Sequence, residues 1–126
     1  MNLIDSSAWL AYFAGEPGAA HFAEAIEDTE RLVVPSICLY EVFKRVLIQR
    51  GEDNALQVAA LMQQGKIIEL NDRIALSAAQ VSLTHKLAMA DSIILATARI
   101  CDAALWTQDS DFQGLENVHY FPKKPS

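Results

Sequence analysis

The chain alternates short apolar runs with longer segments in which apolar residues recur at helical spacing. Each short run is mainly apolar and is followed by a polar residue or a proline, which is the pattern of a buried strand. The sequence therefore predicts five short strands. They cover residues 2–4, 32–34, 67–70, 103–107 and 118–121.

The longer segments predict six helices. In the fifth of them, Ile74, Ala78 and Val81 recur at spacings typical of one face of an amphipathic helix. Ser36 is a favourable N-cap for the third helix, and Gly51 follows its last residue, where a glycine often ends a helix. The six segments cover residues 7–14, 19–28, 36–50, 53–64, 72–87 and 89–100.

Strands and helices alternate along most of the chain, which is typical of an α/β fold. Mainly apolar strands are covered on both faces, as in parallel sheets packed between helices. The pattern predicts a three-layer sandwich, with a central, mostly parallel sheet of about five short strands flanked by helices. We find no repeat and no linker, so we expect one domain over residues 1–126.

Composition narrows the class of protein further. Hydrophobic residues make up 52% of the chain and charged residues 21%, which excludes a disordered or low-complexity protein. The apolar fraction is high for a small monomer and hints at an interface with a partner or a second copy. The net charge of −6 disfavours a protein that grips nucleic acid by bulk charge alone.

The sequence also indicates a location. Asp5 interrupts the N-terminus before an apolar core of signal-peptide length, and no run approaches the roughly 18 apolar residues of a membrane span. Cys38 and Cys101 form no CxxC pair, so a zinc site is unsupported, and we expect two reduced, buried thiols. We therefore expect a soluble, cytoplasmic protein without membrane contact.

Four acidic residues stand out against this pattern. Asp5 and Asp109 follow the first and fourth predicted strands, and Glu41 and Asp91 interrupt apolar stretches of predicted helices. In open parallel sheets, ligands bind beyond the carboxyl ends of the strands. Carboxylates that meet there repel one another unless a divalent cation lies among them, and Mg²⁺ and Mn²⁺ prefer oxygen ligands.

Each acid taken alone has a structural alternative. Asp5 and Asp109 could cap the turns that follow them, and Asp91 could interact with a helix dipole in a first turn. Glu41 could pair with Arg45 one helical turn later. A shared site explains all four acids together, because all four are expected at one edge of one sheet.

Four segments, in order, resemble the motifs of PIN-domain ribonucleases. The first is Leu3-Ile4-Asp5-Ser6-Ser7 with Trp9-Leu10, and the second runs from Pro35-Ser36-Ile37 to Tyr40-Glu41-Val42. The third covers residues 90–98 and is the most specific, and the fourth covers residues 105–112. Order, spacing and length are similar to those of VapC toxins from type II toxin–antitoxin pairs. The resemblance extends over essentially the whole chain and implies the PIN-like form of the predicted sandwich.

The resemblance implies particular site residues. The acids that match the family's catalytic and metal-binding quartet are Asp5, Glu41, Asp91 and Asp109. Asp111 lies where relatives often carry an acid and is a further metal ligand, although Asp109 falls nearer the strand end. Small hydroxyl residues match positions that support the acids by hydrogen bonds: Ser6, Ser7 and Thr107. Gln108 departs from the basic or polar residue of many relatives, which points to a difference in substrate contact.

The resemblance further implies a Mg²⁺- or Mn²⁺-dependent endoribonuclease that hydrolyses phosphodiester bonds of tRNA or rRNA. Metal-assisted attack by water would leave 5′-phosphate and 3′-hydroxyl ends. The implied partners are the RNA substrate, a VapB-like antitoxin and a second copy of the chain in a homodimer. RNA would then be held locally, and the basic residues near the motifs are Lys44, Arg45, Lys86 and Arg99.

Other functions remain open from the sequence. A housekeeping RNA-processing nuclease of the same family would carry the same acids without acting as a toxin. A non-catalytic PIN-like module could keep them and act through protein contacts. A receiver-type phosphate-transfer protein also has an aspartate after its first strand. That class generally needs a second acid nearby, however, and here Ser6 and Ser7 follow Asp5.

Overall fold

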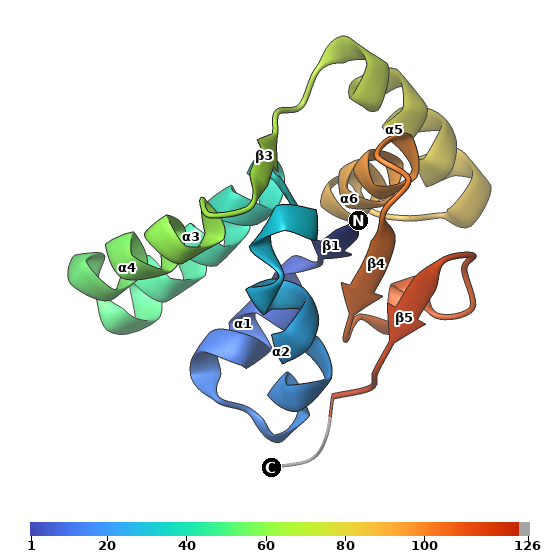
Figure 1. Ribbon diagram of the computed structural model, residues 1–126. Coiled ribbons are helices and arrows are strands. Elements are labelled where there is room, and N and C mark those ends of the chain that lie inside the picture. The colour runs from blue at the N-terminus through green and yellow to red at the C-terminus, as the bar shows by residue number, and fades with distance from the viewer. Residues whose placement is uncertain (124–126) are drawn as a thin grey trace.

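The computed structural model describes residues 1–123 and contains one five-stranded sheet (Figure 1). The strand order is β3-β2-β1-β4-β5, and every neighbouring pair is parallel. This confirms the predicted α/β class and the five short strands. Their bounds are β1 Asn2–Ile4, β2 Leu32–Pro35, β3 Lys66–Ile68, β4 Ala104–Thr107 and β5 Val118–Tyr120.

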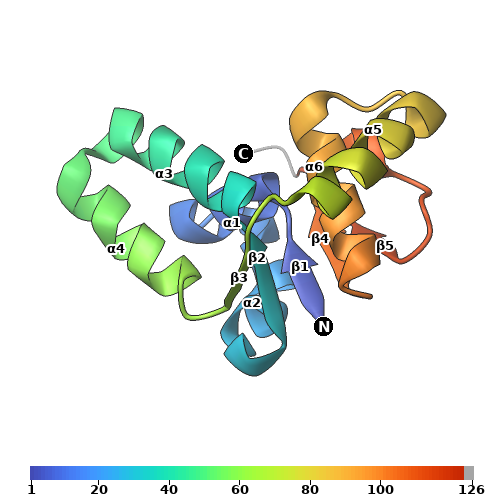
Figure 2. The same ribbon diagram turned by 90° about the horizontal axis from the view of Figure 1, so that it is seen from above.

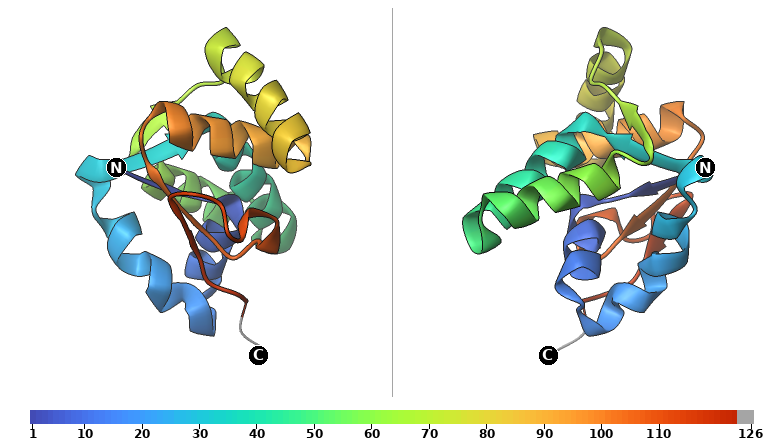
Figure 3. Two further views of the ribbon diagram at one scale, coloured as in Figure 1. Left: turned by 90° about the vertical axis from the view of Figure 1, so that its right-hand side faces the viewer. Right: turned by 60° about the vertical axis from the view of Figure 1, so that its left-hand side comes forward.

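Helices cover both faces of the sheet. Figure 3 shows α1 and α2 on one face and α5 and α6 on the other, while α3 and α4 project as a hairpin in Figure 2. Short 3₁₀ turns η1, η2 and η3 lie at Pro17–Ala19, Thr29–Arg31 and Ser110–Phe112. The helices are α1 Ser6–Ala14, α2 Ala20–Glu27, α3 Ser36–Arg50, α4 Glu52–Met62, α5 Asp72–His85 and α6 Met89–Ile100.

The core lies on both sides of the three inner strands. Leu3, Val33 and Leu105 are at most 1% exposed, because helices cover each face of the sheet on which alternate side chains project. Trp9 of α1 is also buried and stacks on Phe13 with the ring centroids 5.5 Å apart. Continuous apolar strands were the sequence signal for this two-sided burial.

Several predicted element bounds differ from the structure by one or two residues: the strand expected at 67–70 is β3 Lys66–Ile68, and the helix expected at 53–64 is α4 Glu52–Met62. Ser36 is the first residue of α3 and not its N-cap, because the extended backbone of Pro35 leads strand β2 directly into the helix. The fifth helix ends at His85, two residues earlier than expected. Lys86 takes a left-handed conformation with φ 56°, and the Leu87 amide bonds back to the Ser82 carbonyl.

The sheet topology decides where a site can form. The chain builds outward from β1 through β2 to β3, and then returns to the other side of β1 with β4 and β5. The switch in direction lies between β1 and β4, where Ile4 pairs with Trp106 and the Asp5 amide donates to the Trp106 carbonyl at 2.9 Å. Ligands of open α/β sheets bind at the carboxyl ends of the strands beside such a switch.

Two further expectations concern the thiols and the membrane. Cys38 and Cys101 are both free in the structure, the first buried and the second half-buried. Within residues 1–123, no helix has the length and apolar character needed to cross a membrane.

Candidate active site

Asp5 is the most deeply placed acid. It follows β1, is 3% exposed, and begins α1 through its backbone without capping the helix with its side chain. Its Oδ2 accepts hydrogen bonds from Ser7 Oγ at 2.7 Å and from Thr107 Oγ1 at 2.9 Å. Burial raises the pKa of the Asp5 carboxyl, the two hydroxyls oppose the rise, and the nearby Asp109 charge adds to it.

Thr107 joins the first and fourth motifs. Its hydroxyl donates to Asp5 and accepts from the Asp109 amide at 2.9 Å, while the Gln108 amide donates to Ser7 Oγ at 3.2 Å. These bonds connect residues about 100 positions apart along the chain. They fix the loop after β4 against the start of α1, so the carboxylates that follow both strands face a common space.

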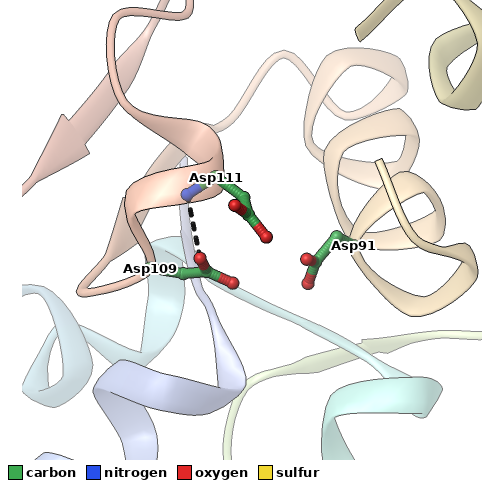
Figure 4. Close-up of side chains that lie close together, drawn as sticks. All are labelled: Asp91, Asp109 and Asp111. Carbon is green, nitrogen blue, oxygen red and sulfur yellow. Dashed lines mark hydrogen bonds between the residues drawn. The ribbon is translucent and has the colours of Figure 1, made fainter. Parts of the chain in front are cut away.

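Asp91, Asp109 and Asp111 form the tightest acidic group. Each offers a carboxylate oxygen, and these oxygens all lie within 4.8 Å of one another. Figure 4 shows the three side chains gathered at one place. Asp91 lies in the first turn of α6. Asp109 and Asp111 come from the loop after β4 and from η3, where Asp109 Oδ1 accepts from the Asp111 amide at 2.9 Å.

The pKa of Asp91 is raised in this crowded group. Burial, followed by repulsion from Asp109, Asp5, Asp111 and Glu41, raises the pKa of Asp91 to about 7. These four acids come from three segments of the chain: the start of α1, helix α3 and the loop after β4 with η3. Without a cation, this constellation is therefore a source of repulsion, and it favours binding of positive charge.

Glu41 is held from another direction. It lies in α3, half-buried, and its Oε1 accepts a hydrogen bond from Ser6 Oγ at 2.8 Å. Within residues 1–123, no ion pair joins Glu41 to Arg45, which was the structural alternative for this acid. Glu41 therefore points toward the start of α1, where Asp5 lies.

The sequence-predicted residues thus occupy one region in two groups. Asp91, Asp109 and Asp111 form the close group. Asp5 and Glu41 lie next to it, and each accepts hydrogen bonds from hydroxyl side chains. Two of the structural alternatives also hold: Asp91 occupies a first turn, and the Asp109 side chain caps η3. These local roles coexist with the shared position of the acids.

Comparison with known families agrees with this geometry. The PIN domain profile matches residues 3–117. The chain belongs to the PIN domain family. No match to this PIN domain is found among curated proteins.

Solved structures with the same fold include chains of toxin–antitoxin systems. A toxin–antitoxin complex from Klebsiella pneumoniae contains a chain 25% identical, with a TM-score of 0.81 over 94% of this PIN domain and 96% of that chain. The Mycobacterium tuberculosis toxin VapC20, which cleaves the sarcin–ricin loop, is 16% identical, with a TM-score of 0.76 and coverage of 94% and 98%. VapBC2 from Rickettsia felis, bound to a promoter DNA fragment, is 12% identical, with a TM-score of 0.74 and coverage of 98% of each chain.

The donor set of the PIN domain fits a hard divalent cation. The close group offers carboxylate oxygens only, and oxygen is the ligand atom that Mg²⁺ and Mn²⁺ prefer. Asp111 is exposed and Asp91 and Asp109 are half-buried, so the group is open to water on one side. A site for these ions usually keeps some water ligands, which such openness permits.

Sequence analysis named Lys44, Arg45 and Gln108 near the motifs, but it missed other residues beside the acids, such as Gln49 and Arg50. Two hollows adjoin the site along α3, and both are lined by Leu10, Arg45 and Gln49. The available signal was the spacing of Glu41, Arg45 and Gln49, which places them one turn apart on one face of a helix. Lys86 and Arg99, also considered from sequence, line neither hollow.

Proposed function

We propose that this PIN domain is a metal-dependent endoribonuclease. The observation that carries the proposal is the group Asp91, Asp109 and Asp111, whose oxygens lie within 4.8 Å at the switch point of a parallel sheet. Carboxylates gathered in this way repel one another, since each raises the cost of ionising the next, and a bound cation relieves that repulsion. Burial and, after it, repulsion from the neighbouring carboxylates raise the pKa of Asp91.

Each residue has a defined task in this proposal. The acids Asp91, Asp109 and Asp111, with Asp5 and Glu41 beside them, would hold Mg²⁺ or Mn²⁺. The bound ion would supply Lewis-acid stabilisation of the phosphate charge and a lowered pKa for an attacking water.

Hydroxyl side chains keep two of the acids in place. Ser7 and Thr107 fix one rotamer of Asp5 and favour its ionised form. Ser6 orients Glu41 in the same manner. Residues that hold a site in one geometry lower the reorganisation needed for reaction.

The substrate we propose is tRNA or rRNA, cut by water to leave 5′-phosphate and 3′-hydroxyl ends. Likeness to a toxin that cleaves the sarcin–ricin loop supports an RNA substrate. We place this activity in the cytoplasm, where such RNAs are found.

The proposed biological role is that of the toxin in a toxin–antitoxin pair. The neighbours from Klebsiella pneumoniae and Rickettsia felis belong to such complexes, which supports a VapB-like antitoxin as partner. A homodimer is the second proposed assembly. Leu76, Leu83 and Met89 are 71%, 84% and 75% exposed on α5 and the start of α6, and large exposed apolar side chains are typical of an interface.

A cleavage assay on total tRNA and rRNA tests the proposal. Wild type and Asp91→Asn are compared in Mg²⁺, in Mn²⁺ and in chelator, and the RNA ends are mapped. We expect cleavage by the wild type only, abolished by chelator, with 5′-phosphate ends. Products dominated by cyclic phosphates would refute attack by water. Equal cleavage by Asp91→Asn would show that the acids are not the site, and an absence of cleavage would favour a non-catalytic module.

Light scattering tests the homodimer separately. The wild type should have the mass of two chains, and Leu83→Glu should have the mass of one, because a charge on the apolar face opposes burial. A two-chain mass for both proteins would place the interface elsewhere, and a one-chain mass for both would refute the homodimer.

A further inference from the structure

Asp91 reaches the acidic group from a different element than its two neighbours. Figure 4 shows Asp109 and Asp111 on one segment, while Asp91 faces them from α6. The bond from the Asp111 amide to Asp109 Oδ1 also ties those two acids together. Among the hydrogen bonds of residues 1–123, none holds the Asp91 carboxylate. Its distance from the other two acids therefore depends on where the first turn of α6 lies.

The first turn of α6 has no side-chain cap. Ala88 is the N-cap residue, and its methyl group cannot accept a hydrogen bond from the free amides of the turn. Asp91 is the third residue of α6, a position from which an acidic side chain can bond back to the N-cap amide. Asp91 is directed toward Asp109 and Asp111 instead. The start of α6 therefore has to be held by other residues.

Two serines fix the turn that leads from α5 into α6. Ser82 Oγ of α5 donates to the Leu87 carbonyl at 2.8 Å, and the Leu87 amide donates to the Ser82 carbonyl at 3.2 Å. Ser82 thus bonds to both backbone groups of Leu87. Ser92 Oγ lies 3.2 Å from the Leu87 carbonyl and 2.8 Å from the Ala88 carbonyl, so its proton can be donated to either. We call Ser82, Ser92 and the Leu87 carbonyl the serine clamp.

Packing alone does not account for the two hydroxyls of the serine clamp. Ser92 is 2% exposed and Leu87 is 6% exposed, while Ser82 is half-buried. Burying a hydroxyl costs free energy unless it forms a hydrogen bond, and alanine would fill nearly the same space without that cost. Both hydroxyls are bonded to the backbone of one short turn. Their contribution is therefore to the conformation of that turn.

The serine clamp and the acidic group lie on two sides of the same helical turn. Ser92 follows Asp91 directly, so the two side chains leave α6 about 100° apart. Ser92 lies on the buried side, and Asp91 is half-buried beside Asp109 and Asp111. A displacement of the turn that carries Ser92 would move Asp91 by a similar distance.

The ions that such a site can hold differ in how much displacement they tolerate. Mg²⁺ demands nearly octahedral oxygen ligands at about 2.0–2.1 Å. Ca²⁺ accepts about six to eight oxygen ligands at about 2.3–2.6 Å in flexible arrangements. Loosening of one carboxylate should therefore weaken binding of Mg²⁺ much more than binding of Ca²⁺.

We propose that Ser82 and Ser92 are positioning residues for the metal site. Through the Leu87 carbonyl they fix the start of α6, and they thereby hold Asp91 where it can share one small cation with Asp109 and Asp111. The inference rests on the proposed metal-dependent nuclease function and deepens it, since it assigns the preference for Mg²⁺ over Ca²⁺ to a turn that does not touch the ion.

Ion binding to the full chain without RNA tests the serine clamp. Electron paramagnetic resonance measures free Mn²⁺, and Mg²⁺ or Ca²⁺ is then titrated in competition. Ser82→Ala and Ser92→Ala should each weaken Mg²⁺ binding about fivefold, the factor expected for the loss of one hydrogen bond. Ca²⁺ binding should weaken by less than about twofold. Ser82→Thr keeps the hydroxyl and should retain Mg²⁺ affinity within about twofold of the wild type.

Two control variants separate positioning from general stability. Thr97→Val removes another buried hydroxyl of α6, which donates to the Ile93 carbonyl at 2.7 Å and lies outside the clamp. It should lower Tm about as much as Ser92→Ala but leave the affinities for both ions unchanged. Ser77→Ala alters a half-buried serine on the same helix as Ser82 and should change neither Tm nor ion binding appreciably.

The possible outcomes distinguish failure of the clamp from failure of the nuclease. Unchanged Mg²⁺ affinity in Ser82→Ala and Ser92→Ala, or an equal loss in Thr97→Val, would overturn the clamp even if the wild type binds the ion and cleaves RNA. Equal weakening of Mg²⁺ and Ca²⁺ would also overturn it, because the ion preference would then not depend on the turn. If the wild type binds none of the three ions, the proposed metal-dependent function fails and the clamp fails with it.

Discussion

Replacing Asp91 by asparagine should make the cation-free protein more stable. Asp91 is half-buried, and with four other carboxylates nearby its pKa is about 7 instead of 3.8. At face value the shift corresponds to about 4 kcal/mol of unfavourable free energy when Asp91 ionises at pH 8. Burial is the largest cause of the shift and repulsion adds to it. Because Asp91 is half-exposed, water reduces both effects, which leaves about 2 kcal/mol. Asparagine has no charge, so Asp91→Asn should raise Tm by about 6–10 °C in chelator at pH 8.

The effect of Asp91 on the stability of the folded protein depends on pH. Because the folded-state pKa of Asp91 is raised, its folded form holds a proton that the unfolded chain has lost between about pH 4 and 7. The stability that Asp91 contributes is therefore complete below its unfolded pKa and is lost as pH rises through about 7. Burial also raises the pKa of Asp5, but Asp5 is present in both the wild type and Asp91→Asn, so its effect cancels in the comparison. The Tm advantage of Asp91→Asn should accordingly be about three times larger at pH 8 than at pH 5.

Divalent cations should reduce or reverse the difference in Tm between Asp91→Asn and the wild type. At about one hundred times its dissociation constant, a bound ion stabilises the folded protein by about 2.7 kcal/mol. Addition of Mg²⁺ or Mn²⁺ at pH 8 should raise the Tm of the wild type by about 10 °C and that of Asp91→Asn much less. Differential scanning fluorimetry at pH 5 and 8, with ion and with chelator, measures all of these differences.

Asp53→Asn is the matched control for Asp91→Asn. Asp53→Asn removes an exposed acid of α4 that lies outside the acidic group, and it should change Tm by less than about 2 °C under every condition. A lower Tm for Asp91→Asn in chelator at pH 8, or an effect that is the same at pH 5 and pH 8, would show that burial and the neighbouring carboxylates do not raise the pKa of Asp91 in the folded protein.

Three further substitutions test the supports of the site and the core. Ser6→Ala removes the donor that holds Glu41, so RNA cleavage should fall about tenfold while Tm changes by less than about 3 °C; an unchanged rate would exclude this support. Thr107→Val deletes the hydroxyl that donates to buried Asp5, and it should cost about 1–3 kcal/mol in urea unfolding, with recovery in Thr107→Ser. Leu105→Ala leaves a cavity at a fully buried position of β4 and should cost about 2–5 kcal/mol; a loss below 1 kcal/mol would contradict the burial.

The sequence contained most of the fold because its signals are local and strong. Apolar runs such as Leu32 to Val34, bounded by proline, predict buried strands without knowledge of their neighbours. Element ends depend instead on backbone conformation that composition does not show. Ser36 has the chemistry of an N-cap, but the chain enters α3 directly from Pro35, and the positive φ of Lys86 ends α5 early.

The candidate site was partly predictable for similar reasons. Asp5 and Asp109 follow strands, and strand ends meet at one edge of a parallel sheet. A spacing of two would place Asp109 and Asp111 on the same side of a strand but not of a helix. Only the turn η3 shows that both reach Asp91. The cations that line the hollows along α3 were harder to predict, because residues such as Arg50 and Lys123 meet only through tertiary packing.

The hydrogen bond from Thr107 to Asp5 has a consequence for the order of events during synthesis. Its two ends are 102 residues apart, and Asp91, Asp109 and Asp111 also belong to the last third of the chain. A nascent chain has β1, β2 and β3 well before β4, and N-terminal segments emerge from the ribosome first. Asp5 and Glu41 have none of the three partners in the acidic group until Asp91 has been added, and the group is complete only when residue 111 has been added. The proposed active site is therefore incomplete on the ribosome until β4 and η3 have been synthesised.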